Sequence, residues 1–212
     1  TRLYAVSPEV ASSPTIGQSS VGTLLTLPLK DGAISLSVAD GKSVAVAPTT
    51  RSASDGAKTY EYLNALGTGA DIDLIAGEGF VKKDIVLRSM PASVAAGGDY
   101  SVTFRLTAAG TSTLSVQTGE DGSATLLKDG KAAAYIWAPY AEAAARTGKD
   151  DQRIPITLSF AERADGLYVT KTIPGAWLRS ASYPVHADLT LSTFAGWGDG
   201  VVETAPYPSS WS

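Results

Sequence analysis

Cysteine is absent from the 212 residues, and histidine occurs only once, as His186. The absence of cysteine excludes disulfides, thiolate metal sites and cysteine nucleophiles together. A single histidine leaves a Ser-His-Asp triad with one candidate base, and no G-x-S-x-G elbow presents a serine to it. One histidine also argues against a zinc site. The sequence therefore predicts a protein that is not an enzyme, with His186 as an ordinary strand residue.

Charge of either sign is sparse, since charged residues make up 18% of the chain and the formal net charge is −4. Lys and Arg are scattered singly apart from Lys82-Lys83, so the chain lacks the basic footprint that a phosphate backbone requires. No apolar run reaches the roughly 18 residues of a membrane helix, and the sequence begins at Thr1 without a charged-then-apolar leader. We expect no nucleic-acid partner, no membrane span, and a soluble chain that is either processed or a fragment.

Turn signals, by contrast, are abundant, because seven Asp-Gly pairs punctuate the chain from Asp31-Gly32 to Asp199-Gly200. An Asp-Gly pair supplies the positive φ angles that a tight primed turn needs. The runs between these turns alternate apolar and polar residues, most clearly from Ile154 to Phe160. This pattern predicts an all-β fold, with one or more β-sandwiches built of antiparallel hairpins and meanders and about twelve to fifteen short strands.

Some segments carry more specific predictions. The alternation from Leu25 to Val46 predicts a three-strand meander that begins with a hairpin at Asp31-Gly32. The run from Phe80 to Arg88 predicts an edge strand or a partly exposed strand, because Lys83 interrupts its apolar face. Residues Ala141 to Arg146 (AEAAAR) form the only helix-prone run, long enough for about two turns. A final strand is predicted near Ala187 to Phe194.

Composition divides the chain into a body and two arms. Residues 1–20 are rich in proline and serine and predict an extended N-terminal arm. Residues 21–194 form the predicted β-sandwich region, with two subdomains that meet near residues 90–98 as an alternative. Residues 195–212 predict an aromatic C-terminal arm.

Aromatic residues of the C-terminal segment are the first candidates for contact with a ligand or a subunit: Phe194, Trp197, Tyr207 and Trp211. They lie among Gly, Asp, Pro and Ser, which cannot form a regular core strand, so these rings need another surface to cover them. Docking onto the same chain is the plainer alternative. Trp137 and Trp177, in strand-like segments with apolar neighbours, are expected to pack in the core.

Carboxylates provide the candidates for a metal site and for acid/base chemistry. Asp71 and Asp73 alternate on one strand face beside the 67–69 loop, which predicts hard oxygen ligands for calcium, although no D-x-D-x-D-G loop is present. The alternative is that both side chains point into solvent while Ile72 and Leu74 point to the core. The candidates for a glycosidase acid/base pair are the same two aspartates and four further acidic residues, none of which lies in a recognisable motif: Glu142, Asp150, Asp151 and Glu162.

Three blocks of residues share an order and spacing. The first holds Tyr60, ADIDL at 70–74 and GFVKKDIVL at 79–87; the second is DGK at 129–131 with IWAP at 136–139; the third is WL at 177–178 with YPVHADLT at 183–190. Over residues 20–192 they resemble a β-rich module of large bacterial Rhs and wall-associated surface proteins that precedes DNRLRE-type domains. The chain departs from that pattern at Leu189, where the family has proline, and at Lys83, where it often has Glu. The resemblance implies a structural surface module without catalytic residues.

The expected function is therefore that of a non-enzymatic structural or surface module in an extracellular or virion assembly. Its terminal arms are predicted to contact other subunits, in a homo-oligomer or a larger assembly, or a neighbouring domain. A carbohydrate-binding adhesion module is the alternative, and it predicts two or more coplanar exposed rings with polar neighbours. The abundance of Gly, Ser, Thr and Ala favours a place outside the cell or on its surface. No cofactor is expected apart from the calcium considered above.

Overall fold

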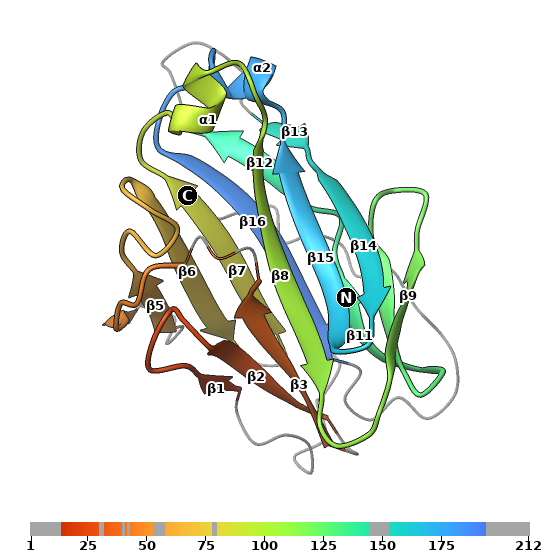
Figure 1. Cartoon of the computed structure of the whole chain (residues 1–212). Coiled ribbons are helices and arrows are strands. Elements are labelled where there is room, and N and C mark those ends of the chain that lie inside the picture. The colour runs from red at the N-terminus through yellow and green to blue at the C-terminus, as the bar shows by residue number, and fades with distance from the viewer. Residues whose placement is uncertain are drawn as a thin grey trace, which may run out of the picture.

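The protein is an all-β, sandwich-like fold of two antiparallel sheets with two short helices, as the sequence predicts (Figure 1). The computed structural model describes residues 14–29, 32–39, 41, 43–52, 58–77, 80–144 and 153–193. Within these residues the chain forms sixteen strands. The helices, α1 (Ala92–Ala95) and α2 (Gly175–Leu178), are single turns. None of the helices in the described residues has the length and apolar character needed to cross a membrane.

The smaller sheet has six strands. Their order is β1 (Thr15–Ile16), β2 (Thr23–Leu29), β3 (Gly32–Val38), β8 (Tyr100–Ala108), β15 (Gly166–Ile173) and β14 (Thr157–Arg163). The hairpin predicted at Asp31-Gly32 is confirmed, because β2 pairs antiparallel with β3. The third strand predicted to follow it, through Val46, is wrong. Residues 43–48 form no strand, and their backbone bonds instead to Ser20 and Ala65.

The larger sheet has ten strands. Its main order is β4 (Thr49–Ser52), β5 (Lys58–Tyr62), β6 (Ala70–Gly77), β7 (Phe80–Leu87), β16 (Val185–Thr193), β11 (Lys131–Ile136), β10 (Ala124–Lys128) and β9 (Leu114–Thr118). Beside β16, β12 (Tyr140–Ala143) and β13 (Arg153–Pro155) extend the same sheet. Asp129 and Gly130 both have positive φ, 51° and 75°, which is the primed turn that joins β10 to β11.

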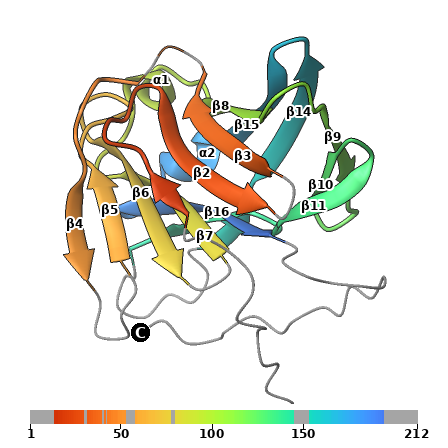
Figure 2. The ribbon, with the colours of Figure 1, turned by 90° about the horizontal axis from the view of Figure 1, so that it is seen from below.

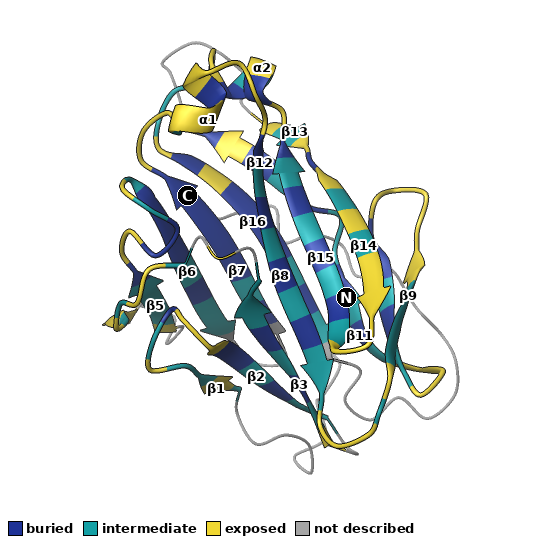
Figure 3. Ribbon diagram, viewed as in Figure 1, coloured by how far each residue is buried: buried dark blue, intermediate teal, exposed yellow. Residues whose placement is uncertain are grey.

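The two sheets stack as layers, and Figure 2 shows the smaller sheet over the larger one. Period-two alternation turns one side of each strand inward, as in β15, where Leu167, Val169 and Ile173 are buried. Figure 3 shows this alternation along β8 and β15, and nearly continuous burial along β7. The inward side chains of both sheets form one hydrophobic cluster. This shared core holds the layers together.

Strands from both sides of residues 90–98 contribute to both sheets. The smaller sheet takes β1 to β3 from before this segment, and the larger sheet takes β4 to β7. Residues 90–98 contain α1 and carry the chain from β7 in one layer to β8 in the other. Residues 14–20, which belong to the predicted N-terminal arm, lie against the sandwich, where β1 pairs with β2 and Ser20 is fully buried.

The prediction that the strand from Phe80 is an edge strand or partly exposed is wrong, because nearly all of the described β7 side chains are buried. β7 pairs with β6 on one side and with β16 on the other, so it is central. Lys83, on which the prediction rested, points into the core and is fully buried. A lysine side chain has a four-carbon stem that packs like an apolar residue, so it can occupy an inward position in a central strand.

The helix predicted for Ala141 to Arg146 is also wrong over its described part. Tyr140–Ala143 is strand β12, which pairs with β16 and β13. Ala141 and Ala143 are buried while Glu142 is exposed, which is the alternation of a strand. Alanine and glutamate favour helices by about 0.5 kcal/mol per residue at most, so pairing with a central strand overrides that preference. Trp177, expected in a strand, lies in α2 instead and packs half-buried against the core.

Candidate functional site

A line of four acidic residues crosses the outer face of the larger sheet, the face turned away from the smaller sheet. Glu61 on β5 lies opposite Asp73 on β6, Asp73 opposite Asp84 on β7, and Asp84 opposite Asp188 on β16. We call these four residues the carboxylate row. Directly opposed side chains in antiparallel strands have Cβ atoms about 4.5–5.5 Å apart. Four neighbouring strands therefore bring four carboxylates into one line.

Asp84 is the most buried member of the carboxylate row and has an incomplete set of partners. Its side chain is 7% exposed. Lys82 Nζ lies 3.3 Å from Asp84 Oδ2, and His186 Nδ1 lies 3.8 Å from the same oxygen. The other oxygen, Oδ1, is buried and has no hydrogen-bond donor among the described residues. Asp188, in contrast, accepts from the Thr190 hydroxyl at 3.1 Å and 3.3 Å.

Three carboxyl groups of the carboxylate row have shifted pKa values, and the shifts differ in direction. Burial, with the charges of Glu61 and Asp84, raises the pKa of Asp73 to about 6. Burial would also raise the pKa of Asp84, but its interactions with His186 and Lys82 outweigh burial and lower it. Burial and the Asp84 charge raise the pKa of Asp188. The proximity of Asp84 raises the pKa of His186. Asp84 is thus the ionised centre of the carboxylate row, and Asp73 is its most readily protonated neighbour.

The predicted calcium pair, Asp71 and Asp73, is divided by its surroundings. Asp71 Oδ1 accepts from the backbone N–H of Asn64 at 2.6 Å and from Arg88 Nη2 at 3.0 Å. Asp73 lies two residues along the same face, next to Glu61 and Asp84. Within the described ranges, no three His, Cys, Asp or Glu residues are arranged to hold a metal ion. Calcium binding stays a prediction, and its test is given below.

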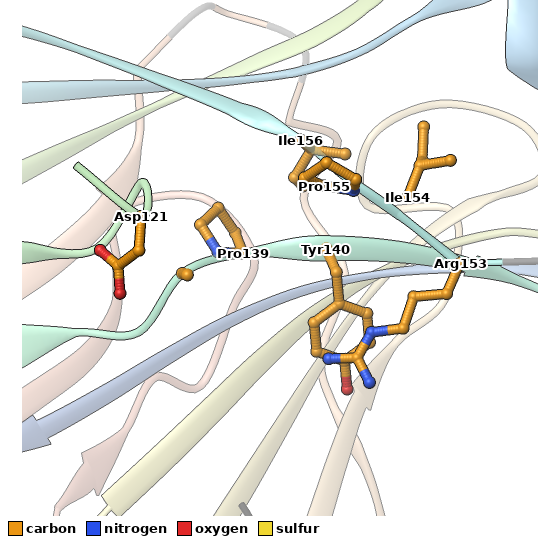
Figure 4. A pocket seen from close by; sticks show the side chains of 8 residues that line it. Asp121, Pro139, Tyr140, Arg153, Ile154, Pro155 and Ile156 are labelled. Carbon is orange, nitrogen blue, oxygen red and sulfur yellow. The ribbon is translucent and has the colours of Figure 1, made fainter. Parts of the chain in front are cut away.

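A shallow depression of about 280 Å³ lies beside β12 and β13 (Figure 4). Pro139, Pro155 and Ile156 form apolar walls, and Tyr140 and Arg153 contribute polar groups. The Arg153 guanidinium lies 3.3 Å above the Tyr140 ring, so this aromatic face is already covered. Elsewhere on the larger sheet, Tyr135 and Trp137 meet edge to face at 89°, and Trp137 Nε1 donates to Ser192 Oγ at 2.8 Å. These rings are not the coplanar platform that sugar stacking would use.

Two lysines are buried on the inner face, between the sheets. Lys83 Nζ lies 3.2 Å from the centroid of the Phe104 ring and has no hydrogen-bond acceptor among the described residues. Lys171 Nζ, which comes from the smaller sheet, donates to the Ala187 carbonyl at 2.5 Å. Burial lowers the pKa of Lys171 to about 8. Burial and the nearby Lys171 charge lower the pKa of Lys83 well below its usual value. Burying these two amines in the hydrophobic core costs free energy of folding.

The residues that the sequence singled out have different outcomes. Phe194, Trp197, Tyr207 and Trp211 lie outside the described residues. His186 is a strand residue on the outer face, between Glu142 and Val86 in the register, and its ionic contact is with Asp84. Asp84, Asp188, Lys83 and Lys171 were not predicted, because their proximity arises from strand register and not from spacing along the chain. Alternation alone could have placed Asp84 and Asp188 on an outer face.

A comparison of the chain with protein-family models, with curated proteins and with solved structures finds no match.

Proposed function

We propose that this protein is a non-enzymatic structural module of an extracellular, cell-surface or virion assembly, and that its terminal arms contact other subunits or a neighbouring domain. The observation that supports this most is the way the sandwich holds the base of each arm. β16, which leads to the C-terminal arm, is paired on both sides along the larger sheet. An element paired on both sides is well suited to transmit load between an arm and a rigid body.

The base of the N-terminal arm is held by several hydrogen bonds. Tyr62 Oη donates to the Gly17 carbonyl at 2.6 Å, and Gly17 N donates to the Leu24 carbonyl at 2.8 Å. Ser20 is bound at its backbone and its hydroxyl by residues 43–46. These bonds hold residues 17–20 against the sandwich. A surface module that holds this segment firmly can support an attached arm or domain.

Replacing Tyr62 with phenylalanine tests this anchoring. We expect the unfolding free energy to fall by about 1–2 kcal/mol, because the Gly17 carbonyl loses its donor in a buried setting. Amide hydrogen exchange near Gly17 should accelerate more than exchange in β8. Tyr60→Phe, at a half-buried tyrosine of the same strand, is the matched control and should change stability by less than about 0.5 kcal/mol. Equal losses in both variants would contradict a specific anchor at Tyr62.

The aromatic arm is tested by self-association of the full chain. We expect the double variant Trp197→Ser/Trp211→Ser to weaken association at least about tenfold, because buried aromatic anchors carry roughly 2 kcal/mol or more in protein interfaces. Light scattering coupled to size exclusion over a range of concentrations measures this. Val201→Ser/Val202→Ser removes apolar residues from the same arm and is the matched control.

The same preparation decides between the structural proposal and glycan binding. If the full chain is a monomer at every concentration and binds selectively on a glycan array, the structural proposal fails. The carbohydrate-binding module then replaces it. The perpendicular Tyr135 and Trp137 rings and the covered Tyr140 ring make the structural proposal the better supported of the two.

A further inference from the structure

We propose that Asp73 takes up a proton in mildly acidic solution and, through that proton, donates a hydrogen bond to Asp84 Oδ1. The carboxylate row then binds one proton, which makes the module more stable in acid than at neutral pH. This inference is independent of the proposed function. It concerns the outer face of the larger sheet, which the arms do not explain.

The geometry provides both partners of the shared proton. Asp73 and Asp84 are directly opposed on β6 and β7, and both lie on the outer face because their chain neighbours Ile72 and Ile85 are buried in the core. Asp84 Oδ1 is a buried acceptor without a donor. Among the described residues, no hydrogen bond or ion pair engages the Asp73 carboxyl, and Glu61 and Asp84 are its directly opposed cross-strand neighbours. A protonated Asp73 carboxyl is the donor that Asp84 lacks.

Charges from every neighbouring strand act on Asp73. Acidic groups predominate nearest to it, and the cations are engaged with individual carboxylates. Lys82 and His186 lie on Asp84, Arg88 lies on Asp71, and Arg51 lies on Glu61. Asp188, Tyr140 and Arg153 follow on β16, β12 and β13, and Lys171 interacts from the inner side of the sheet with Asp84 and Asp188. Asp73 is therefore left beside like charges, and a proton relieves that repulsion.

The direction of the pH effect follows from the folded and unfolded states. The pKa of Asp73 is raised to about 6 in the folded protein from 3.8 in the unfolded chain. Stability from its proton is fully present below about 4 and is lost as the pH rises through about 6. The raised pKa of His186 acts in the same direction. Asp84, whose pKa is lowered, loses its contribution only when the pH falls below 3.8. The maximum stability is therefore expected at about pH 4.

Urea unfolding of the full chain at about pH 7.5 and about pH 5 tests the proposal. We expect the folding equilibrium constant of the natural sequence to rise several-fold on acidification, which is less than the roughly tenfold rise that a pKa shift from 3.8 to about 6 would give, because Asp73 is partly exposed. Asp73→Asn keeps a donor without a charge, so it should be more stable at pH 7.5 and should lose most of the rise. Asp71→Asn is the matched control, because its carboxylate is already paired with Arg88 and Asn64, and it should keep the rise.

Carbon-13 NMR of the aspartate carboxyl groups provides a direct readout of the proton. We expect the Asp73 carboxyl signal to titrate near pH 6 in the natural sequence. In His186→Gln it should titrate at a higher pH, because the His186 charge lowers the pKa of Asp73. The proposal is overturned if no aspartate titrates above about pH 5, or if Asp73→Asn keeps the full rise. It is equally overturned if millimolar calcium at pH 7.5 stabilises the natural sequence as much as acid does. In that case Asp73 belongs to a cation site, as the sequence predicts for Asp71 and Asp73.

Discussion

Replacing Lys83 with methionine makes the protein more stable at neutral pH, by about 2 kcal/mol. The Lys83 amine is fully buried and lacks a hydrogen-bond acceptor among the described residues. Its charge lies against the face of the Phe104 ring. Such a contact recovers part of the cost of removing an ammonium from water, but not all of it. Methionine fills a similar volume without a polar atom, and its sulfur packs favourably near an aromatic ring.

Urea unfolding at pH 7 measures the effect of Lys83→Met, with Lys82→Met as the matched control. Lys82 is the adjacent lysine, but it lies on the outer face, 3.3 Å from Asp84 Oδ2. Its removal leaves a buried carboxylate with one cation fewer, so this variant should be less stable. If the unfolding free energy of Lys83→Met falls by more than about 1 kcal/mol, the expectation that the buried amine destabilises the folded protein is contradicted.

Lys83→Met should also change how stability depends on alkaline pH. Both buried lysines have lowered pKa values, so the unfolded chain binds more protons than the folded one above their folded pKa values. Stability of the natural sequence therefore rises with pH from about 8 to 10.5 for Lys171, and from well below 10.5 for Lys83. The variant should lose the Lys83 part of this rise. Above pH 10 the raised pKa of Tyr62 acts in the opposite direction.

Phe104→Ala is expected to cost about 3–5 kcal/mol, a large part of the 5–15 kcal/mol that stabilises a typical domain. Phe104 is 1% exposed and lies in β8, the strand at the centre of the smaller sheet, between β3 and β15. Its removal leaves a cavity between the layers and exposes the Lys83 amine to that cavity without the ring. A cavity beside a buried amine is a place where water would enter.

Phe160→Ala is the matched control for Phe104→Ala. Phe160 lies in β14, at the edge of the same sheet, and is half-buried. Its loss should cost about 1–2 kcal/mol, because an edge site can relax and remains partly solvated. Denaturant unfolding followed by circular dichroism compares the two. An equal or larger loss at Phe160 would mean that the core does not centre on β8.

The fold class followed from local signals, whereas the position of each strand did not. Alternation and Asp-Gly turns act over a few residues, so the hairpins of β2 with β3, β10 with β11, and β14 with β15 could be predicted. The central position of β7 depends on β16, about a hundred residues later. Lys83 appeared to mark an edge because charge usually indicates solvent, and a buried lysine is an exception that only the packing reveals.

The candidate site could be predicted only in part for the same reason. Alternation correctly turned Asp71 and Asp73 away from the core side of β6. That Asp84 and Asp188 stand next to Asp73 depends on register, and a shift by one residue would turn either of them to the other face. The sequence therefore suggested a pair of aspartates for calcium, whereas strand pairing joins Asp73 to a different pair.

The order of synthesis gives the position of β16 a further consequence. β16 lies within the larger sheet, with β7 on one side and β11 and β12 on the other, yet it is the last of the described strands to leave the ribosome. Until β16 is synthesised, β7 and β11 each have one unpaired edge, and the hydrophobic core between the two sheets is only partly covered. Folding of the whole sandwich must then wait until β16 has been synthesised. During that interval the unpaired edges of β7 and β11 are exposed to edge-to-edge association with other chains.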